Sequence, residues 1–229
     1  MTTGLLRRLR SEYVYLTTAL RVLGGIKPIA RHRTRTLPDL IARQAARHGH
    51  RIALLGRDES LTYAQLVARS HRYSRWALAQ GLGKGDTVAL MMGARPDYIA
   101  AWLGLVRVGA VAALLNTHQS GQALAHSLDI VAAKCVLADP HLTGAIETAE
   151  QHLEHEIPVW VTGAEPGERH GLDAALAAQD PAEVPADLLP NLTIDDPALY
   201  IYTSGTTGMP KAAILNHFRV QAIMCGFSA

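Results

Sequence analysis

Between residues 87 and 161, short apolar runs alternate with longer segments that have the length and spacing of helices. The apolar runs lie at 87–92, 111–115, 134–138 and 158–161. The segments between them that we predict as helices are 96–107, 119–132 and 141–152. Strands joined by helices in this order pair in parallel, and a parallel sheet is normally buried. The pattern therefore predicts an α/β fold with a mostly parallel sheet covered by helices on both faces.

The residues before this alternation predict two more helices, at 37–48 and 63–80, with a strand at 51–56 between them. Thr62 is a suitable N-cap for the second helix, and Gly81 stands where a glycine usually follows a helix end. After the alternation, residues 165–196 are rich in Pro, Ala and Asp, and we expect them to form a surface excursion.

The apolar run at 98–115 raises the alternative of a membrane-spanning helix. Arg107 interrupts that run and Gly109 follows it. A helix followed by a strand also continues the alternation on both sides. We therefore interpret the run as part of the sheet fold.

A stretch rich in hydroxyl groups and glycine lies between two further strand-like segments, at 198–202 and 212–215. Glycine allows a positive φ and lets a ligand approach the backbone N–H groups. Hydroxyl donors and one lysine ammonium on such a loop suit a polyphosphate. The candidate nucleotide-binding residues are Thr203, Ser204, Gly205, Thr206, Thr207, Gly208 and Lys211.

Two alternatives for this stretch fit the sequence less well. A flexible Ser/Thr/Gly linker is disfavoured because apolar strand-like runs flank the stretch and Pro-Lys ends it. A P-loop of the kinase and GTPase kind would require Gly at position 210 and Ser or Thr at position 212. The chain has Pro210 and Ala212, so that motif fails twice.

The run Tyr-Thr-Ser-Gly-Thr-Thr-Gly-Met-Pro-Lys at 202–211 resembles the signature loop of the adenylate-forming, or AMP-binding, superfamily. The resemblance extends over about residues 37–220, through segments such as 61–66, 85–89 and 102–110. Ala112-Ala-Leu-Leu-Asn116, Leu124-Ala-His126 and the Pro-Lys-Ala-Ala exit are most similar to the fatty-acid-transport, very-long-chain acyl-CoA synthetase branch. Most other members carry Gly where this chain has Ala212.

The resemblance implies the N-terminal part of the large domain of an acyl-CoA synthetase. Its function would be that of an ATP-dependent long- or very-long-chain fatty acyl-CoA ligase acting through an acyl-adenylate. In that family the loop holds the β- and γ-phosphates of ATP, Mg²⁺ assists, and CoA is the co-substrate. Two alternatives stay open: an adenylating enzyme that loads a carrier protein, and a non-catalytic remnant or interaction module of the same fold.

Several parts that the family uses later in its sequence have no counterpart in residues 1–229. They are a glutamate for magnesium, an aspartate for the ribose, and a mobile C-terminal domain with a lysine used in adenylation. We assign no catalytic residue and no metal ligand within this chain. We expect a missing C-terminal half, and no turnover by residues 1–229 alone.

The first 36 residues form a basic segment, with eight Lys or Arg residues against Glu12 alone, whereas the remainder is net acidic. The residues Leu5, Leu6, Leu9, Tyr13, Leu16, Leu20 and Leu23 follow a helical spacing. Residues 5–23 therefore predict a basic amphipathic helix, either on a membrane surface or packed on the protein body. Residues 24–36, with two glycines and Pro28, are expected to be a linker.

These observations divide the chain into a helix-and-linker segment, 1–36, and an incomplete AMP-binding domain, 37–229. The arginines in the first segment exclude a secretory signal and a membrane span. Cys135 and Cys225, without a CxxC motif, fit buried thiols in a reducing cytosol. We expect a cytoplasmic protein without a nucleic-acid partner, and the basic helix adds the alternative of a peripheral location at the inner membrane face.

Overall fold

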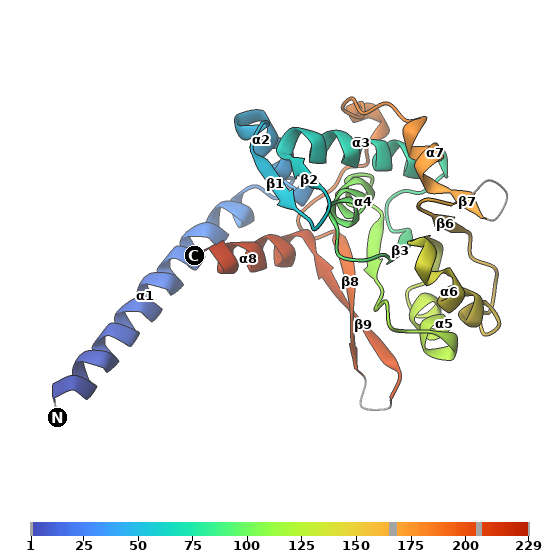
Figure 1. Ribbon diagram of the computed structural model, residues 1–229. Coiled ribbons are helices and arrows are strands. Elements are labelled where there is room, and N and C mark those ends of the chain that lie inside the picture. Colours follow the sequence, from blue (N-terminus) through green and yellow to red (C-terminus); the bar gives the residue numbers. More distant parts are fainter. Residues whose placement is uncertain (1, 165–168, 205–207, 229) are drawn as a thin grey trace.

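The computed structural model describes residues 2–164, 169–204 and 208–228 (Figure 1). Within these residues, a seven-stranded sheet has the order β7-β6-β5-β3-β4-β8-β9. Its strands are β3 (Thr87–Met91), β4 (Val111–Leu114), β5 (Ala133–Ala138), β6 (Val159–Val161), β7 (His170–Gly171), β8 (Pro197–Ser204) and β9 (Pro210–Asn216). Neighbours pair in parallel except β8 and β9, which are antiparallel. The predicted mostly parallel sheet is therefore confirmed.

Helices cover both faces of the sheet, as predicted. One face carries α3 (Tyr63–Ala79) and α4 (Pro96–Arg107), and the other carries α5 (Gly121–Asp129) and α6 (Thr143–Glu150). In β3, Val88 and Leu90 lie in the core on the α3 side, whereas Ala89 and Met91 lie in the core on the α5 side. Side chains alternate between the faces of a strand, so a strand buried on both faces must be apolar throughout.

The local signals at the ends of α3 act as predicted. The backbone N–H of Gln65 donates to the Thr62 hydroxyl at 3.3 Å, and the Gln65 side chain accepts from the Thr62 N–H at 2.9 Å. This capping box satisfies two N–H groups that would otherwise lack partners. Gly81 follows the helix with φ of +72°, a conformation that favours glycine. Upstream lie α2 (Leu37–His48) and a separate hairpin of β1 (Ile52–Leu55) and β2 (Ser60–Thr62).

The crossing of α3 and α4 requires a residue without a side chain. A Cβ atom on Gly104 would lie 2.4 Å from the Cβ of Tyr73 and 2.5 Å from the carbonyl oxygen of Ser70. At the same crossing the Ser74 hydroxyl, which is fully buried, donates to the carbonyl of Gly104 at 2.9 Å. The two helices therefore approach through backbone contact, which brings α4 close to the sheet.

The expected surface excursion at 165–196 is more structured than the sequence suggested. Its described part, 169–196, contributes β7 to the sheet edge, the short helix α7 (Leu172–Ala177), and the 3₁₀ turn η2 (Ala186–Leu188). Leu172, Leu176, Val184 and Ile194 are buried. A few apolar side chains, widely spaced among Pro and Asp, are enough to hold this segment against the body.

Helix α1 (Thr2–Arg31) is longer than predicted, and it includes Pro28. The prediction that residues 24–31 belong to a linker is therefore wrong, and 32–36 alone separate α1 from α2. Gly25 lies against α8 (His217–Ser228), where an added Cβ would be 3.2 Å from the sulfur of Cys225. Ile29 is buried. This packing offsets the backbone hydrogen bond that a proline removes from a helix interior.

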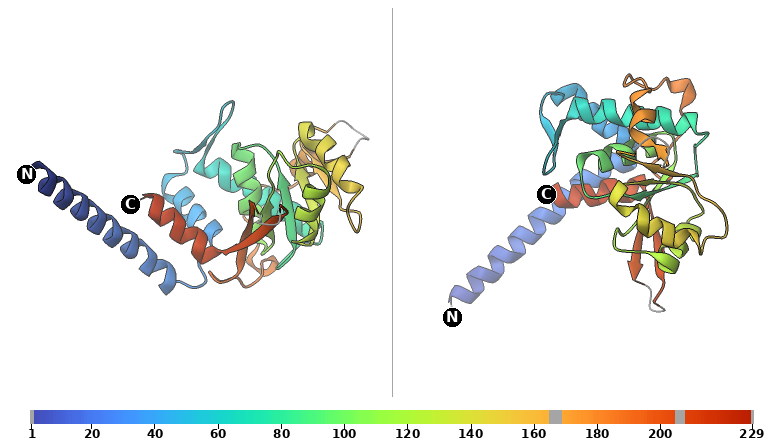
Figure 2. Two further views of the ribbon diagram at one scale, coloured as in Figure 1. Left: turned by 90° about the horizontal axis from the view of Figure 1, so that it is seen from below. Right: turned by 45° about the vertical axis from the view of Figure 1, so that its right-hand side comes forward.

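Three leucines of the predicted stripe in α1, Leu16, Leu20 and Leu23, face away from the protein body. Leu16, Leu20 and Leu23 are 58%, 68% and 55% exposed, while the contact with α8 is made through Gly25. Figure 2 shows the N-terminal half of α1 reaching beyond the other elements in both views. Packing of these three leucines on the described body is therefore excluded. No helix in the described part of the chain is long and apolar enough to span a membrane.

His217, a buried histidine that begins α8, contacts the start of α2. The backbone N–H of Leu37, in the first turn of α2, donates to Nδ1 of His217 at 3.3 Å. Burial lowers the pKa of His217 to about 4, so the ring stays neutral at pH 7 and this nitrogen can accept. The contact satisfies one of the N–H groups that a helix start leaves without a partner.

We predict that Gly104→Ala destabilises the protein by about 1–3 kcal/mol or more, because the added methyl group meets backbone and Cβ atoms that cannot move aside. Gly144→Ala is the matched control, since nothing lies within 4 Å of its Cβ position in α6. That change should be neutral or stabilising by up to about 1 kcal/mol. Urea denaturation of both variants measures the difference, and equal stabilities would contradict the crowded crossing.

Candidate functional site

The predicted phosphate loop connects the two strands of the β8–β9 hairpin, at the edge of the sheet where the parallel strands end. Pairing of β8 with β4 stops at Ile201, whereas pairing with β9 continues to Ser204 opposite Pro210. The last residues of β8 therefore extend beyond the neighbouring strand. Figure 1 shows the ends of both strands reaching past the body of the sheet.

Alternation along the hairpin separates its solvent-facing residues from those that face the protein core. Thr203 and Lys211 are directly opposite each other on the two strands, and both are exposed. Directly opposed residues have Cβ atoms about 4.5–5.5 Å apart, so a hydroxyl and an ammonium group can reach the same ligand. Tyr202 and Ala212, the next pair, pack against the core on the α5 side.

Helix α5 fixes the position of the hairpin. The hydroxyl of Tyr202 donates to the carbonyl of Ser127 at 2.6 Å, and burial raises the pKa of Tyr202 above its ordinary value. Nε2 of His126 lies 3.1 Å from the carbonyl of Pro210, a hydrogen bond that requires the proton on that nitrogen. These two bonds hold both strands immediately beside Thr203 and Lys211.

The structure describes only some of the other candidate residues. Gly208 has φ of +84°, so the turn uses the conformational freedom expected of a glycine there. Ser204 is the last residue of β8. Gly205, Thr206 and Thr207 lie outside the described residues, and their predicted role stays a prediction.

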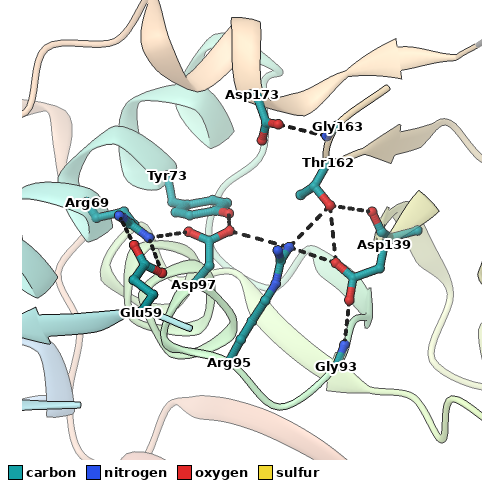
Figure 3. A network of polar contacts seen from close by, with 11 residues as sticks. Glu59, Arg69, Tyr73, Gly93, Arg95, Asp97, Asp139, Thr162, Gly163 and Asp173 are labelled. Atoms are coloured by element: carbon teal, nitrogen blue, oxygen red, sulfur yellow. Dashed lines mark hydrogen bonds and ion pairs between the residues drawn. The ribbon is translucent and has the colours of Figure 1, made fainter. Parts of the chain in front are cut away.

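A second group of polar residues lies at the ends of β3, β5 and β6 (Figure 3). Asp139 directly follows β5, and 7% of its side chain is exposed. Its carboxylate pairs with Arg95 at 2.7 Å and accepts hydrogen bonds from the Thr162 hydroxyl at 3.1 Å and the Gly93 N–H at 2.7 Å. These contacts tie together the loops that leave three parallel strands.

The network continues from Arg95 onto α3. Asp97, in the first turn of α4, lies 3.8 Å from Arg95 and accepts a hydrogen bond from the hydroxyl of Tyr73 at 2.7 Å. Arg69 lies 3.4 Å from the same carboxylate and pairs with Glu59 at 2.6 Å. Burial and the nearby Asp97 raise the pKa of Tyr73 well above its ordinary value. The carboxylates of this group are thus neutralised by the protein itself.

The sequence pattern did not predict this network, although one signal for it is present. Arg95, Asp139 and Thr162 each come within four residues of the end of a buried strand. Polar residues in such places gather at the carboxyl edge of a parallel sheet, where α/β proteins commonly bind ligands. Here their charges are already paired, whereas no ion pair of Lys211 is found within the described residues. The hairpin is therefore the part of the edge better suited to a charged ligand.

The described residues do not form a magnesium site. Among them, no group of three or more Asp, Glu, His or Cys side chains is placed to hold a metal ion. The nearest candidates by chemistry, Asp97 and Asp139, are paired with Arg95. Both carboxylates are therefore already engaged by an arginine side chain.

Comparison with known proteins identifies the family. The AMP-binding enzyme family matches residues 41–228, which is most of the chain. The chain belongs to the AMP-binding enzyme family. Its candidate phosphate loop therefore lies within a matched AMP-binding region, and the predicted resemblance is confirmed.

Curated relatives of this family member include two proteins named for fatty acids. Long-chain fatty acid transport protein 2 of Rattus norvegicus is 40% identical over 197 residues, which is 83% of this chain and 31% of the relative. Medium/long-chain-fatty-acid–CoA ligase FadD6 of Mycobacterium tuberculosis is 38% identical over 176 residues, which is 77% of this chain and 28% of the relative. The chain thus spans less than a third of the length of these relatives.

Solved structures share the fold of this chain. The anthranilate CoA ligase AuaEII, in complex with anthranoyl-AMP, matches with a TM-score of 0.74 at 20% identity, covering 81% of this chain and 35% of that one. The N-terminal domain of FACL13 from Mycobacterium tuberculosis matches with a TM-score of 0.69 at 25% identity, covering 80% of this chain and 44% of that one. The described sheet is therefore that of the N-terminal part of adenylate-forming enzymes.

We predict that Arg95→Met destabilises this protein by about 1–3 kcal/mol, because it leaves the buried carboxylate of Asp139 without its cation. Arg33→Met is the control, because Arg33 and Asp195 form an ion pair whose side chains are 68% and 56% exposed. Loss of an exposed pair should cost less than about 1 kcal/mol. Denaturant unfolding compares them, and a smaller effect at Arg95 than at Arg33 would disprove the role of the network.

Proposed function

We propose that this protein is an ATP-dependent fatty acyl-CoA ligase that acts on long- or very-long-chain fatty acids through an acyl-adenylate. The names of its curated relatives support the substrate class, and the AMP-binding family supports the chemistry. The whole reaction is proposed for the whole protein, because the chain spans less than a third of those relatives. The absence of ligase turnover by residues 1–229 alone stays a prediction.

In the proposed first step, a fatty acid carboxylate attacks the α-phosphorus of ATP, and the bond from that phosphorus to pyrophosphate breaks. Negative charge then builds on the departing pyrophosphate. Donors that are already in place lower the barrier because they stabilise this charge without reorganising. In the second step the CoA thiol attacks the acyl carbon, the bond to AMP breaks, and the thiol proton is released.

The observation that carries the proposal is the exposed pair of Thr203 and Lys211 at the overhanging end of the hairpin. A hydroxyl donor and a cation face the same side, and both can bind phosphate oxygens. His126 and Tyr202 position this pair by holding the strand backbones on α5. We propose that Ser204, Gly205, Thr206, Thr207 and Gly208 complete the phosphate site, with Mg²⁺ held by residues outside the described chain.

We predict that Lys211→Ala slows fatty-acid-dependent exchange of pyrophosphate into ATP by roughly 10- to 100-fold in the whole protein. The reason is that a charge-assisted hydrogen bond contributes about 1.5–3 kcal/mol. Lys134→Ala is the matched control, because Lys134 is an exposed lysine on β5. Exchange should be unchanged in this control.

Equal exchange rates for Lys211→Ala and the unaltered protein would remove the phosphate role. Exchange without acyl-CoA formation would instead favour the carrier-protein alternative. If the unaltered protein catalysed no exchange at all, the non-catalytic alternative would be favoured.

We further propose that the leucine stripe of α1 binds an anionic membrane surface. Its members Leu16, Leu20 and Leu23 are exposed on the side away from the body, and the segment 1–36 carries eight basic residues against one acidic residue. A helix with one apolar face and nearby positive charge can lie in the interface of an anionic bilayer without spanning it. A peripheral location at a membrane follows from this proposal.

We predict that replacing Leu16, Leu20 and Leu23 together with Gln weakens co-sedimentation with anionic vesicles by at least about tenfold, because exposed leucines lose the apolar environment of the bilayer. Raising the salt concentration should weaken the binding of the unaltered protein, since its basic residues act through screened electrostatics. Leu188→Gln is the control, because Leu188 is 52% exposed in η2, far from α1 in the sequence. Sedimentation that is the same in all three proteins would rule the proposal out.

A further inference from the structure

A groove of about 570 Å³ lies where α1 meets α2 and α8. This volume is within the range of about 300–1,000 Å³ that is usual for small-molecule sites. Its apolar lining includes Pro28 and Ile29 of α1, Leu40 and Ile41 of α2, and Met224 of α8. The groove is separate from the phosphate hairpin, since none of its lining residues belongs to β8 or β9.

The polar lining of the groove is cationic or neutral. Arg35 and His32 line it, together with glutamine and tyrosine side chains, and no Asp or Glu is among its described lining residues. An apolar groove with positive charge at its border is complementary to an amphiphilic anion. A neutral apolar ligand would gain nothing from the arginine, and a cation would be repelled by it.

Arg35 is the lining residue whose surroundings most favour a bound anion. Its side chain is half-buried, yet no ion pair or side-chain hydrogen bond of this guanidinium is found in the described chain. Arg69 and Arg107, which are also partly buried, each pair with a glutamate. A partly desolvated cation without a counter-charge is costly, and a bound carboxylate would relieve that cost.

We propose that this groove binds one long-chain fatty acid, with the acyl chain among the apolar residues and the carboxylate at Arg35. This inference rests on the proposed function for its choice of fatty acid over other amphiphilic anions. The groove lies along α1, whose leucine stripe we place on a membrane, so a fatty acid leaving the bilayer would meet it before the phosphate hairpin. It would serve as an intake site that is distinct from the place of the reaction.

The chain contains its own reporter for this groove. Cys225 lines it and is half-buried, whereas Cys135 is buried in β5, and burial raises the pKa of Cys135 to about 12. Iodoacetamide reacts with the thiolate, so Cys135 serves as an internal residue that should stay unmodified. The alkylation rate of Cys225 in the whole protein can be followed by mass spectrometry, with and without oleate below its micelle concentration.

Oleate should slow the alkylation of Cys225 severalfold, and oleyl alcohol should require at least about tenfold higher concentration for the same protection, because it lacks the carboxylate. Arg35→Gln should remove this preference for oleate. Arg33→Gln is the matched control, because Arg33 lies two residues away and pairs with Asp195 outside the groove. The control should protect Cys225 as the unaltered protein does.

Alkylation of Cys225 at the same rate with and without oleate would overturn the proposal, and this measurement needs no variant. Equal protection by fatty-acid-free anionic vesicles would also overturn it, since the occupant would then be a lipid surface. Pyrophosphate exchange in the unaltered protein distinguishes the two proposals. Pyrophosphate exchange without protection of Cys225 by oleate would overturn the groove proposal alone. Protection of Cys225 without pyrophosphate exchange would overturn the ligase proposal alone.

Discussion

The structure depends on the burial of both faces of its central parallel strands. In β3, β4 and β5, side chains that alternate between the faces enter two separate cores, so these strands hold almost no polar side chains. Polar side chains therefore lie where the strands end. Asp139, Thr162 and Thr203 all lie there, at the carboxyl edge of the sheet. The position of the candidate site follows from the burial of the sheet.

That edge has two electrostatic regions. At the ends of β3, β5 and β6, Arg95 and its carboxylate partners neutralise one another and tie three loops together. Beyond the end of β4, the β8–β9 hairpin offers an exposed hydroxyl and an exposed cation. The first region gives rigidity to the edge, and the second can bind an anion. A preorganised site needs both, because donors act best when their support does not move.

Helix α1 has two apolar faces with different roles. Gly25 and Ile29 lie on the face that packs against the body, and the leucine stripe lies on the opposite face. The groove between α1, α2 and α8 forms beside the packed face. If the exposed leucines bind a membrane as proposed, this helix connects the fold to a second apolar environment. The membrane proposal and the fatty acid proposal are therefore physically connected.

The sequence by itself determined what is local. The capping box at Thr62, the glycine after α3 and the apolar strands each depend on neighbouring residues, and each could be predicted from them. Predictions from the sequence were wrong where contacts with distant residues outweigh the conformational preferences of a local segment. Pro28 and two glycines predicted a linker, but packing on α8 keeps 24–31 helical, and a few buried side chains order the segment 169–196.

Only the tertiary structure decided which groups meet. The opposed positions of Thr203 and Lys211, the bond from His126 to the hairpin, and the pairing of Arg95 with Asp139 join residues far apart in the chain. The exposed direction of the leucine stripe and the groove at Arg35 also depend on how whole helices pack. Hydrophobic periodicity shows that a helix has an apolar face. The free energy of packing, however, depends on both of the elements that pack together. One partner's sequence therefore leaves the choice of contact open.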